Sequence, residues 1–271
     1  MAETLAGRVA LVTGGARGIG RAVAIGLAAD GADVGISYRR DPHLAAESVA
    51  EIEAAGRRSL AVRADLREPA DLDALVASVA DRLGPPDILV CNAGVDFRGA
   101  PVTDTSYDEV LGPMQINALA AHQLCRLVVP GMRERPRGDV VMISSIATRV
   151  RGADYAPYVM SKAALEALAD VLAKEEARNR IRVNVVAPGL VRTEMGDSFL
   201  ELIGADGWGS VESTFPFGRV CEADDVADVV RWLVSARGSY VTGQCIYVDG
   251  GGAPEWHGVP DPAPAEQPTA R

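Results

Sequence analysis

Short apolar segments alternate with helical patterns along most of the chain. The apolar segments lie near residues 8–13, 33–38, 59–64, 87–91, 138–144, 181–187 and 244–248, and the helical ones near 18–30, 42–56, 69–83, 106–134, 157–179 and 223–236. Alternation of this kind predicts parallel strands joined by right-handed crossovers through helices. We therefore expect an α/β fold, a doubly wound parallel sheet of about seven strands with helices on both faces.

A glycine-rich turn follows the first predicted strand. The strand runs into Thr13-Gly14-Gly15-Ala16-Arg17-Gly18-Ile19-Gly20, and a helical pattern follows. Glycines at 14, 18 and 20 let the backbone turn tightly and come close to a pyrophosphate, which the helix amino terminus would face. The spacing differs from the commoner Gly-x-Gly-x-x-Gly fingerprint, so a strand-to-helix connection without a ligand is the alternative interpretation.

A tyrosine, a lysine and a serine further along the chain suit acid–base chemistry. Tyr158 and Lys162 lie one helical turn apart, so the phenol and the ammonium project from the same face. A tyrosine with a pKa near ~10 transfers protons poorly at neutral pH, and the nearby cation is expected to lower that pKa. Ser145 ends an apolar segment upstream, where it would orient a carbonyl oxygen beside the phenol.

Several motifs in order resemble the short-chain dehydrogenase/reductase family, from residue 5 to about residue 252. The matching positions are the turn 13–20, Asn92-Ala93-Gly94, Asn117, Ser145, Tyr158, Lys162, Pro188-Gly189 with Thr193, and the last strand with its flanks, 240–251. The resemblance implies one Rossmann-type domain over residues 1–252, with a substrate lid at 194–221. It also implies a homotetramer, formed through the long helices near 106–134 and 157–179.

The resemblance further implies a role for each matched residue. Tyr158 would protonate the nascent alkoxide, and Lys162 would lower the Tyr158 pKa and bind the nicotinamide ribose. Ser145 would donate a hydrogen bond to the substrate oxygen, and Asn117 would hold a water that relays protons to Lys162. The cofactor would lie against Gly14, Gly18, Ile19, Gly20, Asp65, Leu66, Asn92, Ala93, Gly94, Pro188, Gly189, Val191 and Thr193. Structural roles are the alternative, such as Asp65 capping the next helix.

The end of the second predicted strand bears on the choice of dinucleotide. An NAD-selective site of this fold places Asp or Glu there, bonded to the adenine-ribose hydroxyls. Here the strand exits into Arg39 and Arg40, with no carboxylate at its end. Arginine presents a planar fork of donors that suits a 2′-phosphate. We therefore expect NADP(H), contacted by Arg17 and Arg39 with Ser37 and Arg40 as auxiliaries. Solvated arginines and NAD(H) are the alternative.

Composition excludes several other classes. The formal net charge of −10 argues against nucleic-acid binding. No apolar run is long enough to span a bilayer and no signal peptide precedes the first strand, so we expect a cytoplasmic protein. The cysteines at 91, 125, 221 and 245 lack paired metal-ligand spacing, so we expect reduced, mostly buried thiols and no metal.

Two further segments bear on partners. The tail 253–271 is rich in proline and is expected to be disordered. The segment between Ser145 and Tyr158 carries Arg149 and Arg151, which would suit an anionic substrate or a phosphopantetheine-linked acyl chain. Solvated side chains are the alternative for both.

The sequence thus predicts an NADPH-dependent reductase of ketones, similar to 3-oxoacyl-carrier-protein reductases, that acts on a small-molecule carbonyl or alcohol or on an acyl thioester. An NAD-linked secondary-alcohol dehydrogenase is the alternative within the same class. Enoyl reductases of the family usually space the tyrosine and lysine more widely. A non-catalytic dinucleotide-binding module is the alternative from another class, but such proteins usually lose Ser, Tyr or Lys, and here all three are present.

Overall fold

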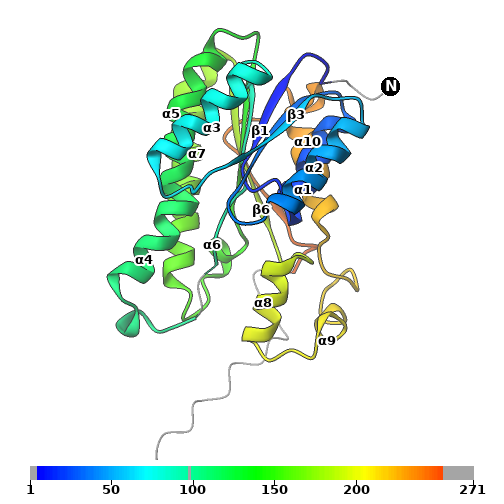
Figure 1. The fold of residues 1–271 in the computed structure, drawn as a ribbon. Helices are drawn as coiled ribbons and strands as arrows, with labels where there is room; N and C mark the ends of the chain where they lie inside the picture. The colour runs from blue at the N-terminus through cyan, green and yellow to red at the C-terminus, as the bar shows by residue number, and fades with distance from the viewer. Residues whose placement is uncertain (1–4, 97–98, 253–271) are drawn as a thin grey trace, which may run out of the picture.

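The computed structural model describes residues 5–96 and 99–252, and it contains one parallel sheet of seven strands (Figure 1). The strands are β1 (Val9–Val12), β2 (Asp33–Tyr38), β3 (Ser59–Arg63), β4 (Ile88–Cys91), β5 (Gly138–Ile143), β6 (Ile181–Pro188) and β7 (Cys245–Val248). Their spatial order is β3-β2-β1-β4-β5-β6-β7. The predicted doubly wound sheet is confirmed, and its order reverses between β1 and β4, where ligands bind in this class of fold.

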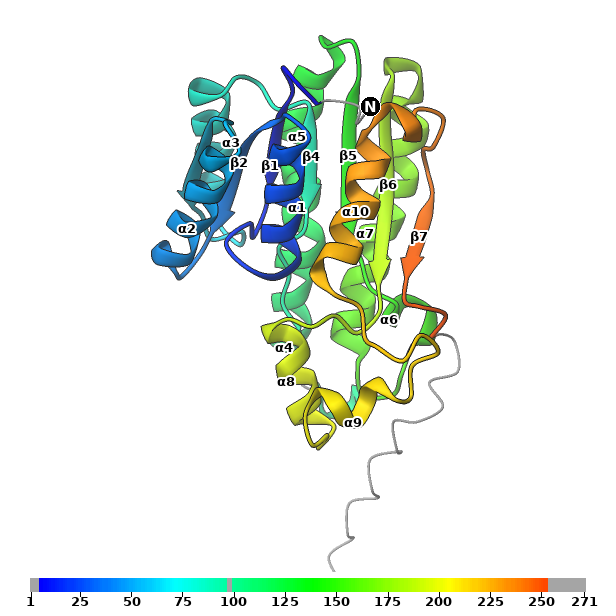
Figure 2. The same cartoon turned by 90° about the vertical axis from the view of Figure 1, so that its right-hand side faces the viewer.

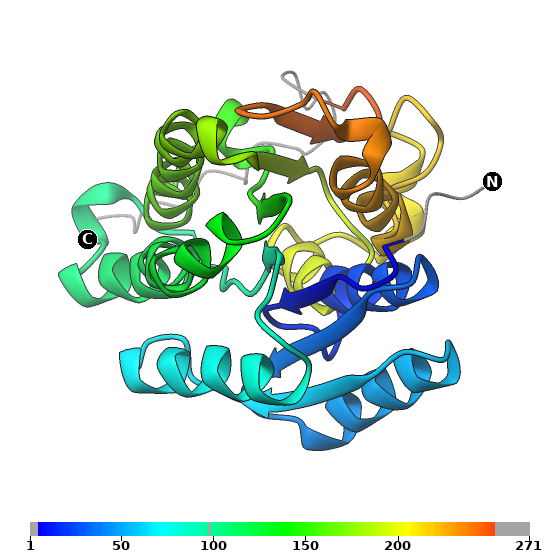
Figure 3. The same cartoon turned by 90° about the horizontal axis from the view of Figure 1, so that it is seen from above.

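Helices cover both faces of the sheet (Figure 3). One layer contains α1 (Gly18–Ala29), α2 (Pro42–Ala54) and α10 (Ala223–Val234), and the other contains α3 (Pro69–Arg82), α5 (Ala120–Arg133) and α7 (Ala156–Glu176). Each layer encloses its own cluster of buried apolar side chains. The central strands feed both clusters, since every residue of β1 is at most 4% exposed. This pattern explains why the strands read as unbroken apolar runs.

The carboxyl ends of the strands carry the shorter helices (Figure 2). These are α4 (Tyr107–Pro113), α6 (Ala147–Val150), α8 (Glu194–Leu202) and α9 (Trp208–Glu212). Elsewhere the chain forms single 3-10 turns at η1 (Val102–Asp104), η3 (Ala177–Asn179) and η4 (Ala236–Gly238). The segment expected to be a lid contains α8 and α9. Its two ends are held together by an isolated parallel bridge between Val191 and Cys221.

One predicted helix is interrupted. The pattern over 106–134 predicts a continuous α-helix, whereas the structure places a π-helical segment, η2 (Met114–Leu119), between α4 and α5. Pro113 and Pro130 lie inside this helical stretch and each lacks an amide hydrogen. Segments of π-helix often occur at functional positions, and this one contains Asn117.

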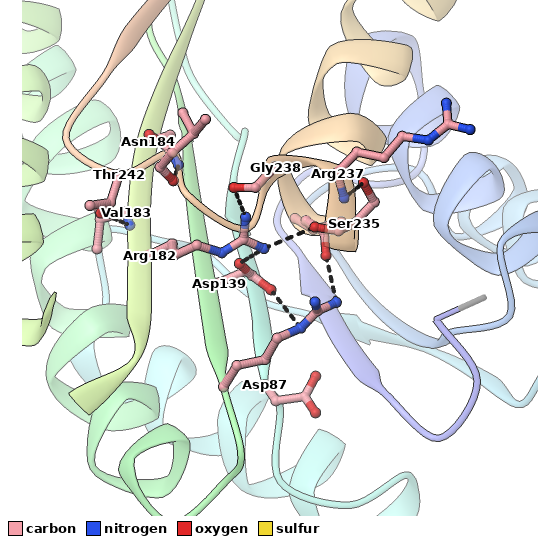
Figure 4. A network of polar contacts seen from close by, with 12 residues as sticks. Asp87, Asp139, Arg182, Val183, Asn184, Ser235, Arg237, Gly238 and Thr242 are labelled. Atoms are coloured by element: carbon pink, nitrogen blue, oxygen red, sulfur yellow. Dashed lines mark hydrogen bonds and ion pairs between the residues drawn. The ribbon is translucent and has the colours of Figure 1, made fainter. Parts of the chain in front are cut away.

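Buried ion pairs join the amino ends of the strands (Figure 4). Arg8 Nε lies 3.0 Å from Asp87 Oδ1, and Arg8 Nη1 lies 2.6 Å from Asp139 Oδ2. Arg182 Nη2 lies 2.5 Å from Asp139 Oδ1. All four side chains are buried, Asp139 at 2% exposure. The network joins the amino ends of the strands, at the end of the sheet that lies opposite the short helices.

The remaining expectations concern the cysteines, membrane-spanning helices and the tail. All four cysteines are free thiols, but only Cys91 and Cys125 are buried and Cys245 is exposed, so the prediction that most are buried holds for half of them. No helix in residues 5–96 and 99–252 is long and apolar enough to cross a bilayer. The tail 253–271 lies outside the described residues.

Candidate active site

The turn between β1 and α1 can be built only with glycine at key positions. Gly14 and Gly18 have φ angles of +66° and +53°, which side chains other than glycine rarely adopt. A Cβ at Gly20 would lie 2.3 Å from the Gly14 carbonyl oxygen. The Gly14 amide donates to Ser37 Oγ at 3.2 Å, so this buried serine holds the turn against β2.

Asn92 ties the glycine-rich turn to the end of β4. Its Nδ2 donates to the Thr13 carbonyl at 2.9 Å, and Thr13 Oγ1 accepts from the amides of Asn92 and Ala93, both at 3.0 Å. The two neighbouring strand ends at the sheet reversal are thereby fixed to each other. The backbone of Asn92-Ala93-Gly94 lines the cleft that opens there.

Gly94 keeps open the space in front of two predicted catalytic residues. A Cβ at this position would lie 3.1 Å from Asn117 Oδ1 and 3.4 Å from Lys162 Nζ. Asn117 is 2% exposed, and its Oδ1 accepts from the Val95 amide at 2.9 Å. Its Nδ2 donates to the Val95 carbonyl at 3.1 Å and to Ser161 Oγ at 2.9 Å. Asn117 therefore joins the loop after β4 to α7, and its predicted water relay stays a prediction.

Ser145, Tyr158 and Lys162 meet where β5 ends against α7. The Ser145 and Tyr158 hydroxyls are hydrogen-bonded to each other. Lys162 Nζ donates to the Ile143 carbonyl at 2.8 Å and lies 5.9 Å from the centroid of the Tyr158 ring. The lysine is 5% exposed. The serine, the phenol and the ammonium thus converge as the sequence predicts.

The expectation that Tyr158 has a lowered pKa is wrong. The pKa of Tyr158 is raised to about 12, chiefly because the surrounding protein desolvates the phenol; the hydrogen bond from Ser145 opposes this rise, and the charge of Asp96 adds to it. Burial also lowers the pKa of Lys162 to about 8. Residue spacing predicts that Tyr158 and Lys162 lie together, but it does not predict the burial that dominates the pKa values of both.

Glu166 supports the serine segment, although sequence analysis did not single it out. Its Oε1 accepts from Ser144 Oγ at 2.5 Å and from Thr148 Oγ1 at 2.8 Å. The Ser145 carbonyl lies 2.9 Å from Thr148 Oγ1 as a second acceptor for the same hydroxyl proton. Glu166 lies one helical turn after Lys162, and this spacing was the signal that would have identified it.

A single cavity of about 1160 Å³ connects these elements. It exceeds the ~300–1,000 Å³ of a typical small-ligand pocket, so it can hold a dinucleotide together with a small substrate. All of the predicted site residues line it except Gly20 and Asn117, which lie behind its wall. Glycines at the turn and at 94 are the positions where a side chain would narrow the groove. The residues present therefore fit a nicotinamide dinucleotide.

The predicted phosphate-binding arginines differ in their surroundings. Arg39 and Arg40 line the cavity at the end of β2. The nearest carboxylate in sequence, Asp41, accepts from the amides of His43 and Leu44 as the N-cap of α2. Arg17 is ion-paired with Glu194 at the start of α8, and both side chains are more than half exposed, at 63% and 61%. Arg17 thus links the glycine-rich turn to the lid.

Asp65 and Thr193 have structural contacts besides their predicted cofactor roles. The Asp65 carboxylate pairs with Arg67, which lowers the Asp65 pKa to about 2. The idea that Asp65 caps the next helix is wrong, because the N-cap of α3 is Glu68. Thr193 is the N-cap of α8, and its Oγ1 accepts from the Gly196 amide at 3.3 Å.

The arginines between Ser145 and Tyr158 point away from the cavity. The guanidinium of Arg149 lies 5.2 Å from the centroid of the Tyr247 ring, and Arg151 Nε donates to the Thr148 carbonyl at 3.0 Å. Neither residue lines the cavity. Asp96, Asp154 and Tyr155 line it instead, and sequence analysis did not identify them. The position of Asp96 two residues after Asn-Ala-Gly was the available signal.

Comparisons with known proteins agree with this geometry. A family model described as enoyl-(acyl carrier protein) reductase matches residues 14–252. L-rhamnose 1-dehydrogenase (NAD(P)(+)) of Sphingomonas sp. is 35% identical over 250 residues, 92% of this chain and 97% of that protein. NADPH-dependent aldehyde reductase 2 of Arabidopsis thaliana is 36% identical over 261 residues, 91% of this chain and 94% of that protein.

Solved structures show the same relationship. L-sorbose reductase from Gluconobacter frateurii, in complex with NADPH and L-sorbose, superposes with a TM-score of 0.86 at 32% identity. The match covers 93% of this chain and 98% of that one. Together with the converging serine, tyrosine and lysine, these matches show the family. The chain belongs to the short-chain dehydrogenase/reductase family and is an oxidoreductase that acts on alcohol or carbonyl groups.

Proposed function

We propose that this protein is an NADPH-dependent reductase that converts a ketone into a secondary alcohol. The observation that carries the proposal is the hydrogen-bonded Ser145–Tyr158 pair, which faces the cavity with Lys162 buried behind it. Two hydroxyl groups that point into one space suit a single carbonyl oxygen. The cofactor, when bound, supplies the hydride.

The protein's own groups then handle the proton. Because its pKa is raised to about 12, Tyr158 is protonated at neutral pH and is suited to donate to the developing alkoxide. Ser145 donates a second hydrogen bond to the same oxygen. Charged Lys162 stabilises the phenolate that forms on Tyr158, and its bond to the Ile143 carbonyl fixes its position. Asn117 positions the loop that faces Lys162.

The preference for NADPH is part of this proposal. Arg17 lines the cavity from the glycine-rich turn, and Arg39 and Arg40 line it at the end of β2. Asp41 lines it too, but its Oδ1 accepts from the His43 and Leu44 amides as the N-cap of α2. The Arabidopsis relative is named for NADPH, and the L-sorbose reductase structure contains it. Assembly as a homotetramer and a cytoplasmic location stay predictions.

Turnover measurements distinguish the NADPH-dependent reductase from an NADH-dependent enzyme and from a non-catalytic dinucleotide-binding module. We would follow oxidation of NADPH and of NADH with a panel of cyclic ketones, ketoses and β-keto thioesters, with Tyr158→Phe alongside. Turnover with NADPH that the variant loses supports the reductase. Turnover with NADH alone would overturn the cofactor preference, and tight cofactor binding without turnover of any carbonyl would favour the binding module.

A further inference from the structure

Ser145 lies in a short link between β5 and α6, residues 144–146, so neither a strand nor a helix fixes the direction of its hydroxyl. Backbone hydrogen bonds to β6 hold the amides of Ser144 and Ile146. The Ser145 side chain depends instead on α6, because the Ala147 amide donates to its Oγ at 3.1 Å and takes one lone pair. The hydroxyl proton must then point elsewhere, and it is directed at Tyr158. The place of Ala147 at the start of α6 therefore decides where this proton points.

One carboxylate oxygen holds both sides of this link. Glu166 Oε1 accepts from Ser144 Oγ at 2.5 Å and from Thr148 Oγ1 at 2.8 Å. Ser144 directly precedes Ser145, Thr148 directly follows Ala147, and these two partners of Glu166 are only 4% and 5% exposed. Hydrogen bonds to a carboxylate are stronger than those between neutral groups, and burial removes the water that would compete for them. Glu166 therefore fixes the residues on either side of the Ser145–Ala147 contact.

The helix that carries Glu166 also carries the catalytic phenol. Tyr158, Lys162 and Glu166 follow one another at four-residue steps on α7, so each lies about one turn beyond the last on the same side of the helix. Helix α6 packs against α7 (Figure 2). Through Glu166 the link that holds Ser145 is attached to the element that holds Tyr158. The two hydroxyl groups are thus positioned relative to one rigid helix.

A second glutamate on α7 makes comparable bonds without any relation to the cavity. Glu176 is 2% exposed, and its Oε2 accepts from Arg133 Nε at 3.0 Å and from Asn179 Nδ2 at 2.8 Å. It lies about 15 Å further along the helix than Glu166, and these contacts join α7 to α5 and to the turn η3. Glu176 therefore shows what a hydrogen-bonded carboxylate of α7 contributes when it only holds the fold together.

We propose that Glu166 is a positioning residue of the reaction, whose carboxylate aims the Ser145 hydroxyl at the substrate oxygen. It does so by holding Ser144 and Thr148, and with them the Ala147 amide that donates to Ser145. Glu166 does not line the cavity, so it acts on the reaction through other groups. The inference rests on the proposed reductase function, in which Ser145 and the catalytic phenol donate to one carbonyl oxygen.

The first measurement compares two substitutions of Glu166. Single-turnover oxidation of NADPH, with the most rapidly reduced ketone of the panel at saturation, reports the reacting step. We expect Glu166→Ala to lower this rate by about tenfold or more, because a displacement of about 1 Å in a reacting group can cost up to ~10²-fold. The Kd for NADPH should change by less than about twofold. Glu166→Gln should keep at least about a third of the parent rate, since its amide oxygen can accept both hydrogen bonds.

The pH of the assay separates positioning from charge. The charge of Glu166 also acts on Lys162, whose pKa is about 8. At pH 6.5 the lysine is protonated in the parent, and the loss of one nearby negative charge is not expected to change that state by more than a small fraction. Rescue by Glu166→Gln at this pH would therefore report the hydrogen bonds and not the charge.

A double-mutant cycle tests whether Glu166 acts through the serine. Ser145→Ala removes the hydroxyl that Glu166 is proposed to aim. In the Ser145→Ala protein, the further change Glu166→Ala should lower the single-turnover rate by less than about twofold, against about tenfold or more in the parent. The matched control is Glu176→Ala, which should lower the thermal midpoint at least as much as Glu166→Ala and leave the rate within about twofold of the parent.

The possible results separate this inference from the reductase itself. A rate in Glu166→Ala within about twofold of the parent overturns the positioning role, and so does the same loss with and without Ser145. A comparable loss of rate in Glu176→Ala overturns it too, since the rate would then follow the stability of α7. If Glu166→Ala does not fold, Ser144→Ala removes a single hydroxyl and enters the same cycle, with an expected loss of about threefold that disappears in Ser145→Ala. Absence of turnover for every carbonyl by the parent protein overturns the reductase, and this inference with it.

Discussion

Buried charge lies both where the strands begin, which we call the amino edge of the sheet, and where they end, which we call the carboxyl edge. The two edges differ in how that charge is neutralised. At the amino edge, Arg8 and Arg182 are paired with Asp87 and Asp139 (Figure 4). At the carboxyl edge, Lys162 is as deeply buried, yet its hydrogen bond goes to a neutral carbonyl. The first arrangement places each of these charges against an opposite one and ties the strands together. The second leaves the charge destabilised beside a cavity, where it is available to chemistry.

This difference predicts opposite outcomes for matched substitutions, and the largest effect is expected at Lys162. Lys162→Met should lower kcat for ketone reduction by about a thousandfold, within the range for loss of acid–base function. The fall of the lysine pKa from 10.5 to about 8 corresponds to about 3 kcal/mol, so the variant should be at least as stable as the parent at pH 7. Chemical denaturation and steady-state kinetics measure the two effects. A strongly destabilised variant would show that Lys162 is structural.

At the amino edge the reverse outcome is expected. Asp139→Asn leaves Arg8 and Arg182 buried with one carboxylate fewer, so the free energy of unfolding should fall by about 3 kcal/mol. The cavity lies at the other edge, so kcat measured below the unfolding transition should change by less than about twofold. Asp228→Asn is the exposed control: its pair with Arg231 is 70% exposed at the carboxylate and should contribute less than about 0.5 kcal/mol. Equal losses of unfolding free energy in Asp139→Asn and Asp228→Asn would show that the buried pairs stabilise the fold no more than an exposed pair does.

The pH dependence of ketone reduction should report the loss of the proton from Lys162. Lysine is charged below its pKa, and the pKa of Lys162 is lowered to about 8, whereas that of Tyr158 is raised to about 12. Both groups therefore carry their protons below pH 8, and kcat/KM should be flat there. Above pH 8 it should fall by about tenfold per pH unit, as the ammonium is lost while Tyr158 stays protonated. In Lys162→Arg this fall should disappear. A rise in kcat/KM with pH would indicate that Tyr158 acts as a base.

The lowered pKa of Lys162 also predicts how the stability of the folded protein changes with pH. The folded protein holds the Lys162 proton less tightly than the unfolded chain, so the unfolded chain binds more protons between pH 8 and 10.5. The cost of burying the charge is therefore fully present below pH 8 and disappears as the pH rises to 10.5. Lys162→Met should remove this rise in stability. The difference between the two proteins should then shrink toward alkaline pH.

The sequence was sufficient to predict the sheet and the convergence of the serine, the tyrosine and the lysine, because both follow from local patterns. Each of the seven apolar runs corresponds to one strand, Ser145 follows β5, and Tyr158 and Lys162 lie on α7. What it missed depends on burial or on contacts between distant segments. Pro113 precedes η2 but does not by itself distinguish a π-helix from an α-helix, and the raised pKa of Tyr158 follows from tertiary packing. The contact between the Ala100 amide and the Asp154 carbonyl likewise needs two loops to be folded together.

The smallest expected effect concerns an ion pair at the carboxyl edge that is exposed. Arg17 pairs with Glu194, whose carboxylate occupies the guanidinium that we assign to the cofactor 2′-phosphate. Arg17→Gln should therefore raise KM for NADPH by about tenfold and leave KM for NADH nearly unchanged. Glu194→Gln should lower KM for NADPH by about threefold, because the phosphate no longer competes with a carboxylate. If both variants change NADPH and NADH equally, the pair holds only the lid, and 2′-phosphate recognition belongs to Arg39 and Arg40. In either case the exposed pair can exchange partners, as the buried pairs of the amino edge cannot.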